Sequence, residues 1–226
     1  MSRVPLLVAT LLAALALAAC GGSDGDDAAS SPTSTPPPSP AETAGCEKVD
    51  APAPKEDADV AKPNEELAAG TTYVATVATS CGDFEITLDA KRAPKTGGSF
   101  KHLADKGFFD GLTFHRVVAG FVIQGGDPRG DGQGGPGYSV VEAPPRSLTY
   151  TKGVVAMAKT ETERPGTSGS QFFVVTAEDA QLPPDYALLG KVTKGQEVVD
   201  KIGVVPTVAN DEPAEPVVIR SIKVSG

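Results

Sequence analysis

Arg116 carries a side chain that can polarise a bound group without a covalent step. Its guanidinium is always charged and presents several N–H donors in a rigid planar fork. Gln124 follows it after the apolar pair Phe121-Val122, and Phe173 supplies another aromatic ring farther along. These residue types suit a site that combines an apolar slot with hydrogen-bond donors. Their structural alternatives are a surface arginine on a strand, a glutamine that caps a turn, and aromatic rings in a core.

Two other kinds of chemistry are not indicated by the sequence. His102 and His115 lie far from any pair of cysteines, so there is no zinc-binding pattern. We expect His102 on a helix surface and His115 packed beside the site. Residues 125–137 contain seven glycines but lack the Gly-Lys-Ser/Thr of a phosphate-binding loop, and turn geometry explains these glycines better. We therefore expect neither a metal nor another cofactor.

Short strands must position these residues. From Thr71 apolar and polar residues alternate, and two alternating runs flank the turn Ser80-Cys81-Gly82, which predicts a hairpin. The strands expected on this basis are 73–79, 83–88, 112–118, 121–124, 154–158, 172–176, 187–192 and 217–224. Because Phe172 and Phe173 are adjacent on a strand, they face opposite ways, so one is expected in the core and the other in a pocket.

Two short helices complete the pattern. Pro94 at a first turn and Gly107 beyond the last turn bound one helix, which the pair Gly97-Gly98 weakens. Residues 196–202 are predicted as the second helix, with apolar residues on one face. Many short strands, two helices and 21 glycines from residue 70 onward favour an all-β fold, a closed antiparallel barrel, over βαβ layers.

Composition divides the chain near residue 70. All 12 Phe and Tyr residues lie at or after Tyr73, and residues 21–69 carry 11 acidic against 3 basic side chains. A stretch without aromatics builds little core, so we expect residues 20–69 to be a disordered Pro- and Asp-rich tether and residues 70–226 to be the folded domain. A docking motif is the alternative reading of the tether's eight prolines. The folded part, with a net charge of −2, offers no basic surface for nucleic acid.

Residues 1–19 have the shape of a secretory signal peptide. Arg3 precedes an apolar stretch that is too short for a comfortable membrane span. It ends in Leu17-Ala18-Ala19-Cys20-Gly21, which resembles the lipobox of bacterial lipoproteins. That resemblance implies that Cys20 is lipidated, becomes the mature N-terminus and anchors the protein on the extracytoplasmic face of the cell membrane. The alternative is an ordinary signal peptide in which Cys20 is incidental.

The other two cysteines, Cys46 and Cys81, would then lie in a compartment where disulfides persist. A bond between them would close a loop of 35 residue steps and contribute about 3–4 kcal/mol in the chain-entropy model. It would also fasten the end of the tether to the first strands. Two buried or reactive thiols are the alternative.

Four blocks of the folded part closely resemble the cyclophilin-type peptidyl-prolyl isomerases. They are residues 114–128, residues 130–138, Met157-Ala158-Lys159 and residues 169–174. The match ends with Leu182 and the strand at 190–192, and it covers essentially all of residues 72–224 in the family's order and spacing. It implies an eight-stranded antiparallel barrel with a helix capping each end. The implied activity is cis–trans isomerisation of X–Pro bonds, here in exported or cell-envelope proteins whose folding it would assist.

The resemblance also assigns roles to single residues. Arg116 matches the catalytic arginine, and Gln124 matches the glutamine that binds the substrate backbone and steadies that arginine. The other positions that match substrate-binding residues are His115, Phe121, Val122, Ala158, Lys159, Phe173, Leu182 and Tyr186. The implied partners are proline-containing polypeptides, and we expect the enzyme to be a monomer.

Two departures from the family pattern concern the rim of the pocket. The chain has no tryptophan, and Gln181 stands where the family has a rim tryptophan, while Tyr186 stands where many relatives have histidine. Both changes imply weak cyclosporin binding with isomerase activity retained. Two other classes are a non-catalytic cyclophilin-like module that only holds proline-containing segments, and a solute-binding lipoprotein. Retention of Arg116 and Gln124 argues against the first, and the small size of residues 70–226 against the second.

Overall fold

The computed structural model describes residues 45–56 and 59–226. The expected signal peptide, Cys20 and the tether up to residue 44 lie outside the described residues. In the part of the chain that is described, no helix is long and apolar enough to cross a membrane.

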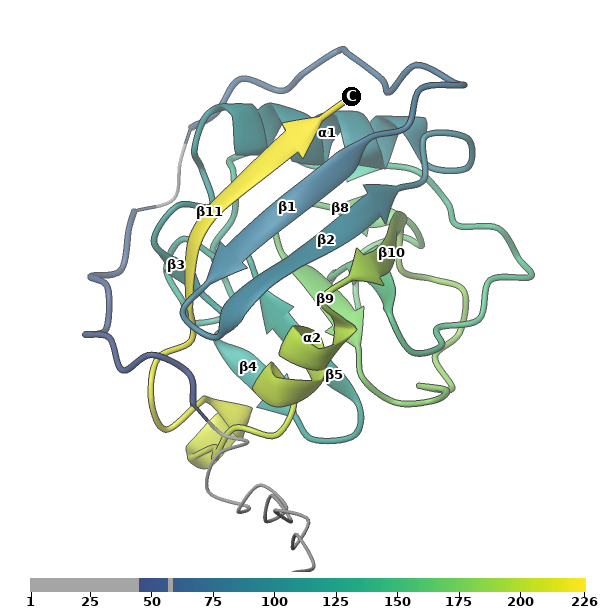
Figure 1. Ribbon diagram of the computed structural model, residues 1–226. Coiled ribbons are helices and arrows are strands. Elements are labelled where there is room, and N and C mark those ends of the chain that lie inside the picture. Colours follow the sequence, from purple (N-terminus) through teal and green to yellow (C-terminus); the bar gives the residue numbers. More distant parts are fainter. Residues whose placement is uncertain (1–44, 57–58) are drawn as a thin grey trace, which may run out of the picture. The chain divides into compact units, whose positions relative to one another are not determined.

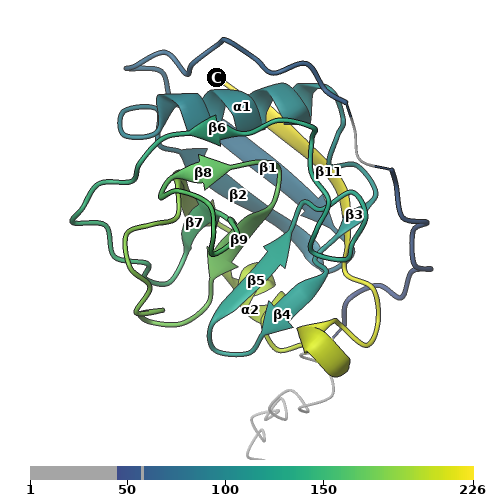
Figure 2. The same cartoon turned by 180° about the vertical axis from the view of Figure 1, so that it is seen from behind.

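Nine antiparallel strands form one curled sheet, and two more form a small ribbon (Figures 1 and 2). The large sheet has the order β3-β11-β1-β2-β10-β7-β9-β5-β4, and β6 pairs with β8. The strands are β1 (Val74–Thr79), β2 (Gly82–Leu88), β3 (Leu112–Thr113), β4 (Arg116–Val118), β5 (Val122–Gly125), β6 (Val140–Val141), β7 (Val154–Met157), β8 (Thr167–Ser168), β9 (Phe172–Val175), β10 (Leu188–Lys194) and β11 (Val218–Ser225). The predicted hairpin is present, with Thr79 opposite Gly82.

The two edge strands of the sheet belong to one stretch of chain, and this closes the barrel. Residues 112–118, predicted as one strand, form β3 and β4 with a two-residue corner between them. The first half pairs with β11 and the second half with β5, and Phe114 N–H donates to Val217 O at 2.9 Å in the corner. Counting that stretch once, the barrel has the eight antiparallel strands that the sequence predicts. Closure leaves no long unpaired edge.

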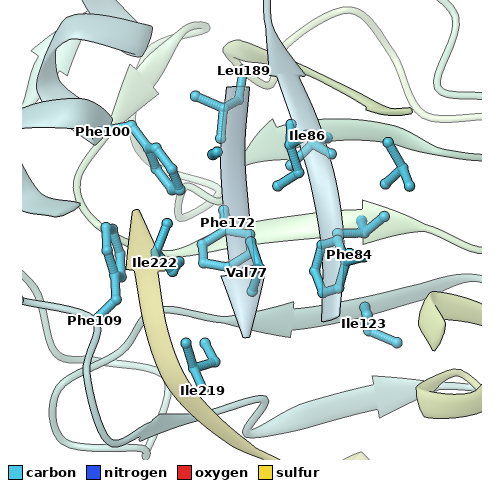
Figure 3. Close-up of a cluster of buried hydrophobic side chains, with 14 of the residues drawn as sticks. Val77, Phe84, Ile86, Phe100, Phe109, Ile123, Phe172, Leu189, Ile219 and Ile222 are labelled. Carbon is cyan, nitrogen blue, oxygen red and sulfur yellow. The ribbon is translucent and has the colours of Figure 1, made fainter. Parts of the chain in front are cut away.

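The barrel interior is filled by aromatic and branched aliphatic side chains from every wall (Figure 3). Phe172 is fully buried, and its ring lies 5.7 Å from Phe100 and 6.0 Å from each of Phe109 and Phe114. Phe100 comes from helix α1 (Pro94–Asp105), which covers one end of the barrel. Helix α2 (Gln196–Ile202) covers the other end with three buried aliphatic residues. Both helices match the predicted ones.

The segment before residue 70 differs from the prediction. The sequence predicted that the folded domain starts at residue 70. Residues 45–56 and 59–69, which we call the strap, nevertheless lie along the domain and contact it (Figure 1). Backbone N–H groups of the strap donate to carbonyls of the domain: Glu47 to Ser80 at 2.7 Å, Lys55 to Pro128 at 2.8 Å, Val60 to Pro136 at 3.1 Å and Leu67 to Pro94 at 3.0 Å. The folded unit therefore begins earlier than the predicted boundary. The polar composition of the strap predicted a disordered tether, but backbone hydrogen bonds and a few apolar side chains hold the strap on the domain.

Leu67 explains the glycine pair inside helix α1. Its side chain is 5% exposed and is part of the main core. A Cβ at Gly97 would collide with Leu67, and one at Gly98 would collide with the backbone carbonyl of Glu65. The glycines that weaken the helix on sequence grounds are therefore the positions where the strap crosses it closely.

A disulfide fastens the other end of the strap. Cys46 and Cys81 are bonded, with Cα atoms 4.0 Å apart and a sequence separation of 35. Of the two alternatives left by the sequence, bonded cysteines are the one that the structure contains. Ion pairs add to this anchor: Glu47 contacts Arg220 of β11, and Lys48 contacts Glu215 at 2.9 Å. The start of the strap is thus tied both to the hairpin turn and to the C-terminal part of the chain.

Candidate active site

Several predicted site residues lie side by side on neighbouring strands, on the outer face of the barrel wall. Arg116 on β4 lies opposite Gln124 on β5, Gln124 lies opposite Phe173 on β9, and Phe173 lies opposite Ala156 on β7. Residues directly opposite on neighbouring strands share one face of a sheet. Phe172, one position away, faces the interior. Because side chains alternate along β9, Phe172 lies in the core and Phe173 lines the site, as the resemblance implied.

One cavity of about 210 Å³ collects nine of the ten predicted catalytic and substrate-binding residues. Its lining consists of Arg116, Phe121, Val122, Gln124, Ala158, Lys159, Phe173, Leu182 and Tyr186. Val122 and Phe173 are buried, while Phe121, Leu182 and Tyr186 are half-buried at the walls. The cavity thus offers an apolar slot with a guanidinium at its mouth, and its volume suits a single small ring.

Tyr150 fixes one wall of this slot. Its hydroxyl donates to the carbonyl of Tyr186 at 2.6 Å and accepts from the Tyr186 N–H at 3.0 Å. Burial raises the pKa of Tyr150 to about 12, so the hydroxyl remains a donor at ordinary pH. The rings of Phe173 and Tyr186 meet edge to face, 5.5 Å apart. Sequence reasoning missed Tyr150, which lies outside every motif that we matched.

Gln124 donates a hydrogen bond within the site that the sequence did not indicate. Its Nε2 donates to Oε1 of Gln171 at 3.0 Å, and Gln171 in turn donates to the carbonyls of Gly132 and Gly134 at 3.1 and 3.0 Å. In the described structure no hydrogen bond joins the amide of Gln124 to Arg116. That amide ties the floor of the site to the glycine-rich loop instead. Gln171 belongs to a matched block, Gly169-Ser170-Gln171, but its role was not foreseen.

The buried carboxylate of Asp127 shapes the same loop. It accepts hydrogen bonds from the N–H groups of Arg129 at 2.8 Å and Gly132 at 2.5 Å. A Cβ at Gly134 would collide with this carboxylate. The glycine-rich stretch is therefore a folded wall beside the site, which agrees with the turn-geometry interpretation.

Lys159 braces the opposite wall. Its Nζ donates to the carbonyls of Thr160 at 3.1 Å and Glu163 at 3.3 Å, and it lies 5.5 Å from the centre of the Tyr186 ring. An ammonium over an aromatic face is attracted to it. Lys159 therefore shapes this edge of the slot.

His115 does not line the cavity that the other nine predicted residues line. It directly precedes Arg116 at the start of β4, and neighbouring side chains on an extended chain point to opposite sides. His115 lines a second cavity of about 270 Å³, whose walls include strap residues 51–54, Asp127 and Glu212. Burial lowers the pKa of His115, and the charge of Asp127 opposes that shift.

Asp211 is the one carboxylate paired with Arg116 in the described structure. Its Oδ2 lies 3.2 Å from Nη2 of Arg116. Asp211 ends the short 3-10 element η2 (Ala209–Asp211), in the loop between α2 and β11. No sequence signal pointed to this contact, because the two residues are distant in the chain and Asp211 belongs to no motif.

Comparisons with known proteins agree with this geometry. The family model for the cyclophilin type peptidyl-prolyl cis-trans isomerase matches residues 74–224. The chain is similar to the probable peptidyl-prolyl cis-trans isomerase A of Mycobacterium leprae, with 41% identity over 67% of this chain and 91% of that protein. It is also 41% identical to peptidyl-prolyl cis-trans isomerase B of Streptomyces anulatus, over 66% of this chain and 95% of that protein.

Solved structures show the same likeness. A cyclophilin type peptidyl-prolyl cis-trans isomerase of Cryptosporidium parvum superposes with a TM-score of 0.64 at 30% identity, covering 69% of this chain and 99% of that one. The same protein crystallised in the presence of the dipeptide Ala-Pro gives a TM-score of 0.63.

The barrel, its slot and these matches define a class of enzyme that acts on the bond before proline. The chain belongs to the cyclophilin-type peptidyl-prolyl cis-trans isomerase family. Its activity is accordingly the cis–trans isomerisation of X–Pro peptide bonds.

Proposed function

We propose that this enzyme isomerises X–Pro bonds in exported or cell-envelope proteins and so assists their folding, acting as a lipid-anchored monomer. The observation that carries the activity is the small apolar slot with Arg116 at its mouth. The relative crystallised with Ala-Pro supports a proline-containing peptide as the occupant of such a slot. The Cys46–Cys81 disulfide supports an oxidising, extracytoplasmic compartment.

Rotation about an X–Pro bond meets a barrier of about 18–20 kcal/mol, because it breaks the resonance of the amide. In the twisted state the lone pair of the proline nitrogen leaves conjugation and can accept a hydrogen bond. The slot formed around Phe173 would hold the ring, while Arg116 would donate to that nitrogen. A donor that is better satisfied in the twisted state than in the planar one lowers the barrier selectively. No bond is broken, so no nucleophile is needed.

The other lining residues would hold the peptide around that ring. Gln124 and Ala158, at the junction of the slot with the glycine-rich wall, are positioned to bind the backbone of the residues before proline. Lys159 contributes through the wall that it braces, since its ammonium is already bonded to two carbonyls.

The test of the activity is a protease-coupled isomerisation assay on the oxidised protein with an X–Pro peptide. We expect a first-order acceleration proportional to enzyme concentration. The non-catalytic alternative predicts that proline peptides bind without any acceleration, and that result would overturn the proposal. Refolding of a cis-proline-limited exported protein, with a cytoplasmic one for comparison, tests the proposed clients.

The lipid anchor is tested by Cys20→Ser. Only a cysteine can carry the thioether-linked lipid at this position, so the variant should lose incorporation of labelled fatty acid and partition away from membranes. Cys46→Ser is the matched control, because that cysteine lies in the disulfide. Undiminished labelling of the Cys20→Ser protein would place the anchor elsewhere.

Cyclosporin should bind about ten- to a hundred-fold more weakly to this chain than to relatives with a rim tryptophan. Gln181 keeps hydrogen-bonding capacity but loses the large apolar face, and burying such a face is worth about 1.5–3 kcal/mol. Gln181→Trp should recover affinity. Its backbone is left-handed, with φ 52°, but glutamine already carries a Cβ there, so the change adds no new backbone clash.

Titration of cyclosporin into the isomerase assay, with Gln181→Ala as the control, measures this effect. Tight inhibition of the parent, or an unchanged inhibition constant in Gln181→Trp, would contradict the assignment of Gln181 to the rim.

A further inference from the structure

The guanidinium of Arg116 forms an ion pair with Asp211 in the protein without substrate. Its Nη2 lies 3.2 Å from Oδ2 of Asp211, and the two side chains are 37% and 46% exposed. This contact uses one edge of the planar fork and leaves other N–H donors for a substrate. Gln124, directly opposite on β5, donates its hydrogen bond to Gln171 and makes none to Arg116 in the described structure. Asp211 is thus the residue that restrains the arginine.

The loop that presents Asp211 is closed on itself. Val208 N–H donates to Glu212 O at 2.7 Å, and Ala214 N–H donates to Pro206 O at 2.8 Å. Thr207 and Pro213 form an isolated antiparallel bridge across the same loop. The carboxylate is therefore carried by an ordered turn braced at its base.

The backbone of that turn has positive φ angles at Asp211 and at the residue before it. Asn210 and Asp211 both have φ of 61°, in the left-handed region that residues with a Cβ rarely adopt. Such conformations persist where the surrounding structure imposes them, and they occur often at functional sites. Here the unfavourable turn places the Asp211 carboxylate against Arg116.

We infer that Asp211 is a positioning residue for Arg116: it orders the guanidinium at the mouth of the slot, so that little conformational freedom is lost when the X–Pro bond twists. This inference rests on the proposed role of Arg116 as the transition-state donor. A long arginine side chain that is ordered in advance costs less to immobilise than a free one. The benefit falls on the chemical step, where the donor acts.

Asp211→Asn is the variant that isolates this effect. It keeps the size of the side chain, and asparagine tolerates the left-handed backbone as well as aspartate does. We expect kcat to fall about two- to five-fold with KM changed by less than two-fold, in line with the modest strength of an exposed ion pair. Glu212→Gln removes the same charge from the next residue of the loop, and it should leave both parameters unchanged.

A double-mutant cycle separates positioning from a general effect on the loop. In an Arg116→Ala background, Asp211→Asn should cause no further loss, because there is no guanidinium left to order. An equal loss in that background, an equal loss from Glu212→Gln, or an unchanged or higher kcat in Asp211→Asn would overturn the inference.

A spectroscopic readout does not depend on the proposed activity. The ¹⁵N–¹H signals of the Arg116 guanidinium, assigned with Arg116→Lys, should show faster rotation of the group in Asp211→Asn than in the parent. If the parent lacks isomerase activity but this difference is present, the proposed function fails while the contact stands. If rotation is equally fast in both proteins, Asp211 does not hold Arg116 and the inference is wrong.

Discussion

Replacing Arg116 with alanine should lower kcat/KM for an X–Pro peptide by about ten- to a hundred-fold. The change removes one hydrogen bond from a charged donor, worth about 1.5–3 kcal/mol, and that bond is strongest in the twisted state. The slot itself keeps its aromatic wall, so binding of the proline ring should weaken much less. The coupled assay with the oxidised protein measures the effect.

Stability should hardly change in this variant, because the Arg116 side chain is partly exposed and its ion pair with Asp211 lies at the surface. Arg146→Ala, at an exposed position outside the slot, is the matched control and should retain full activity. Arg116→Lys keeps the charge but loses the planar fork, so it should fall between the parent and the alanine variant. An Arg116→Ala protein that works at the parent rate would remove Arg116 from the mechanism.

Loss of the Cys46–Cys81 bond should reduce the free energy of unfolding by about 3–4 kcal/mol. The bond closes a loop of 35 residues, and the reduced chain regains that loop's entropy when it unfolds. Urea unfolding of the double variant Cys46→Ala/Cys81→Ala, compared with the oxidised parent, gives the difference. The parent treated with a reductant should approach the variant.

Loss of the disulfide should lower stability but leave the activity of the folded protein nearly unchanged. Strap residues 51–54 line the cavity of His115, and the residues that line the slot of Arg116 include none from the strap. We therefore expect kcat/KM per folded molecule to stay within about two-fold of the parent. A loss of less than about 1 kcal/mol would show that the unfolded chain gains little from an open loop, which the chain-entropy model does not allow.

Strands and helices could be predicted from sequence because their signals are local. A period of two marked β1 and β2, and the same rule separated Phe172 from Phe173. The corner that divides residues 112–118 into β3 and β4 was not predictable in this way. It arises because that stretch must pair with β11 on one side and β5 on the other, and this demand comes from closure of the barrel rather than from local preference.

The residues around the slot were predicted because they lie within motifs of fixed spacing. Asp211 was not, since its contact with Arg116 depends on how a distant loop closes. The strap was missed for a related reason. The composition of the strap is that of a tether. Its packing is indicated only when the apolar side chain of Leu67 is considered together with the glycine pair of α1, which leaves room for the strap.

The place of β11 in the sheet bears on when the protein can fold during its synthesis. β11 (Val218–Ser225) is the last strand of the chain, and it lies between β1, the first strand of the barrel, and β3. Until those final residues leave the ribosome, β1 lacks one of its two neighbours and the wall beside α1 stays open. Native contacts that join the two ends of a chain also make folding slow. The barrel can therefore close only once β11 has left the ribosome, so a chain released before β11 is made would keep the complete sequence of its slot and still lack the structure that forms it.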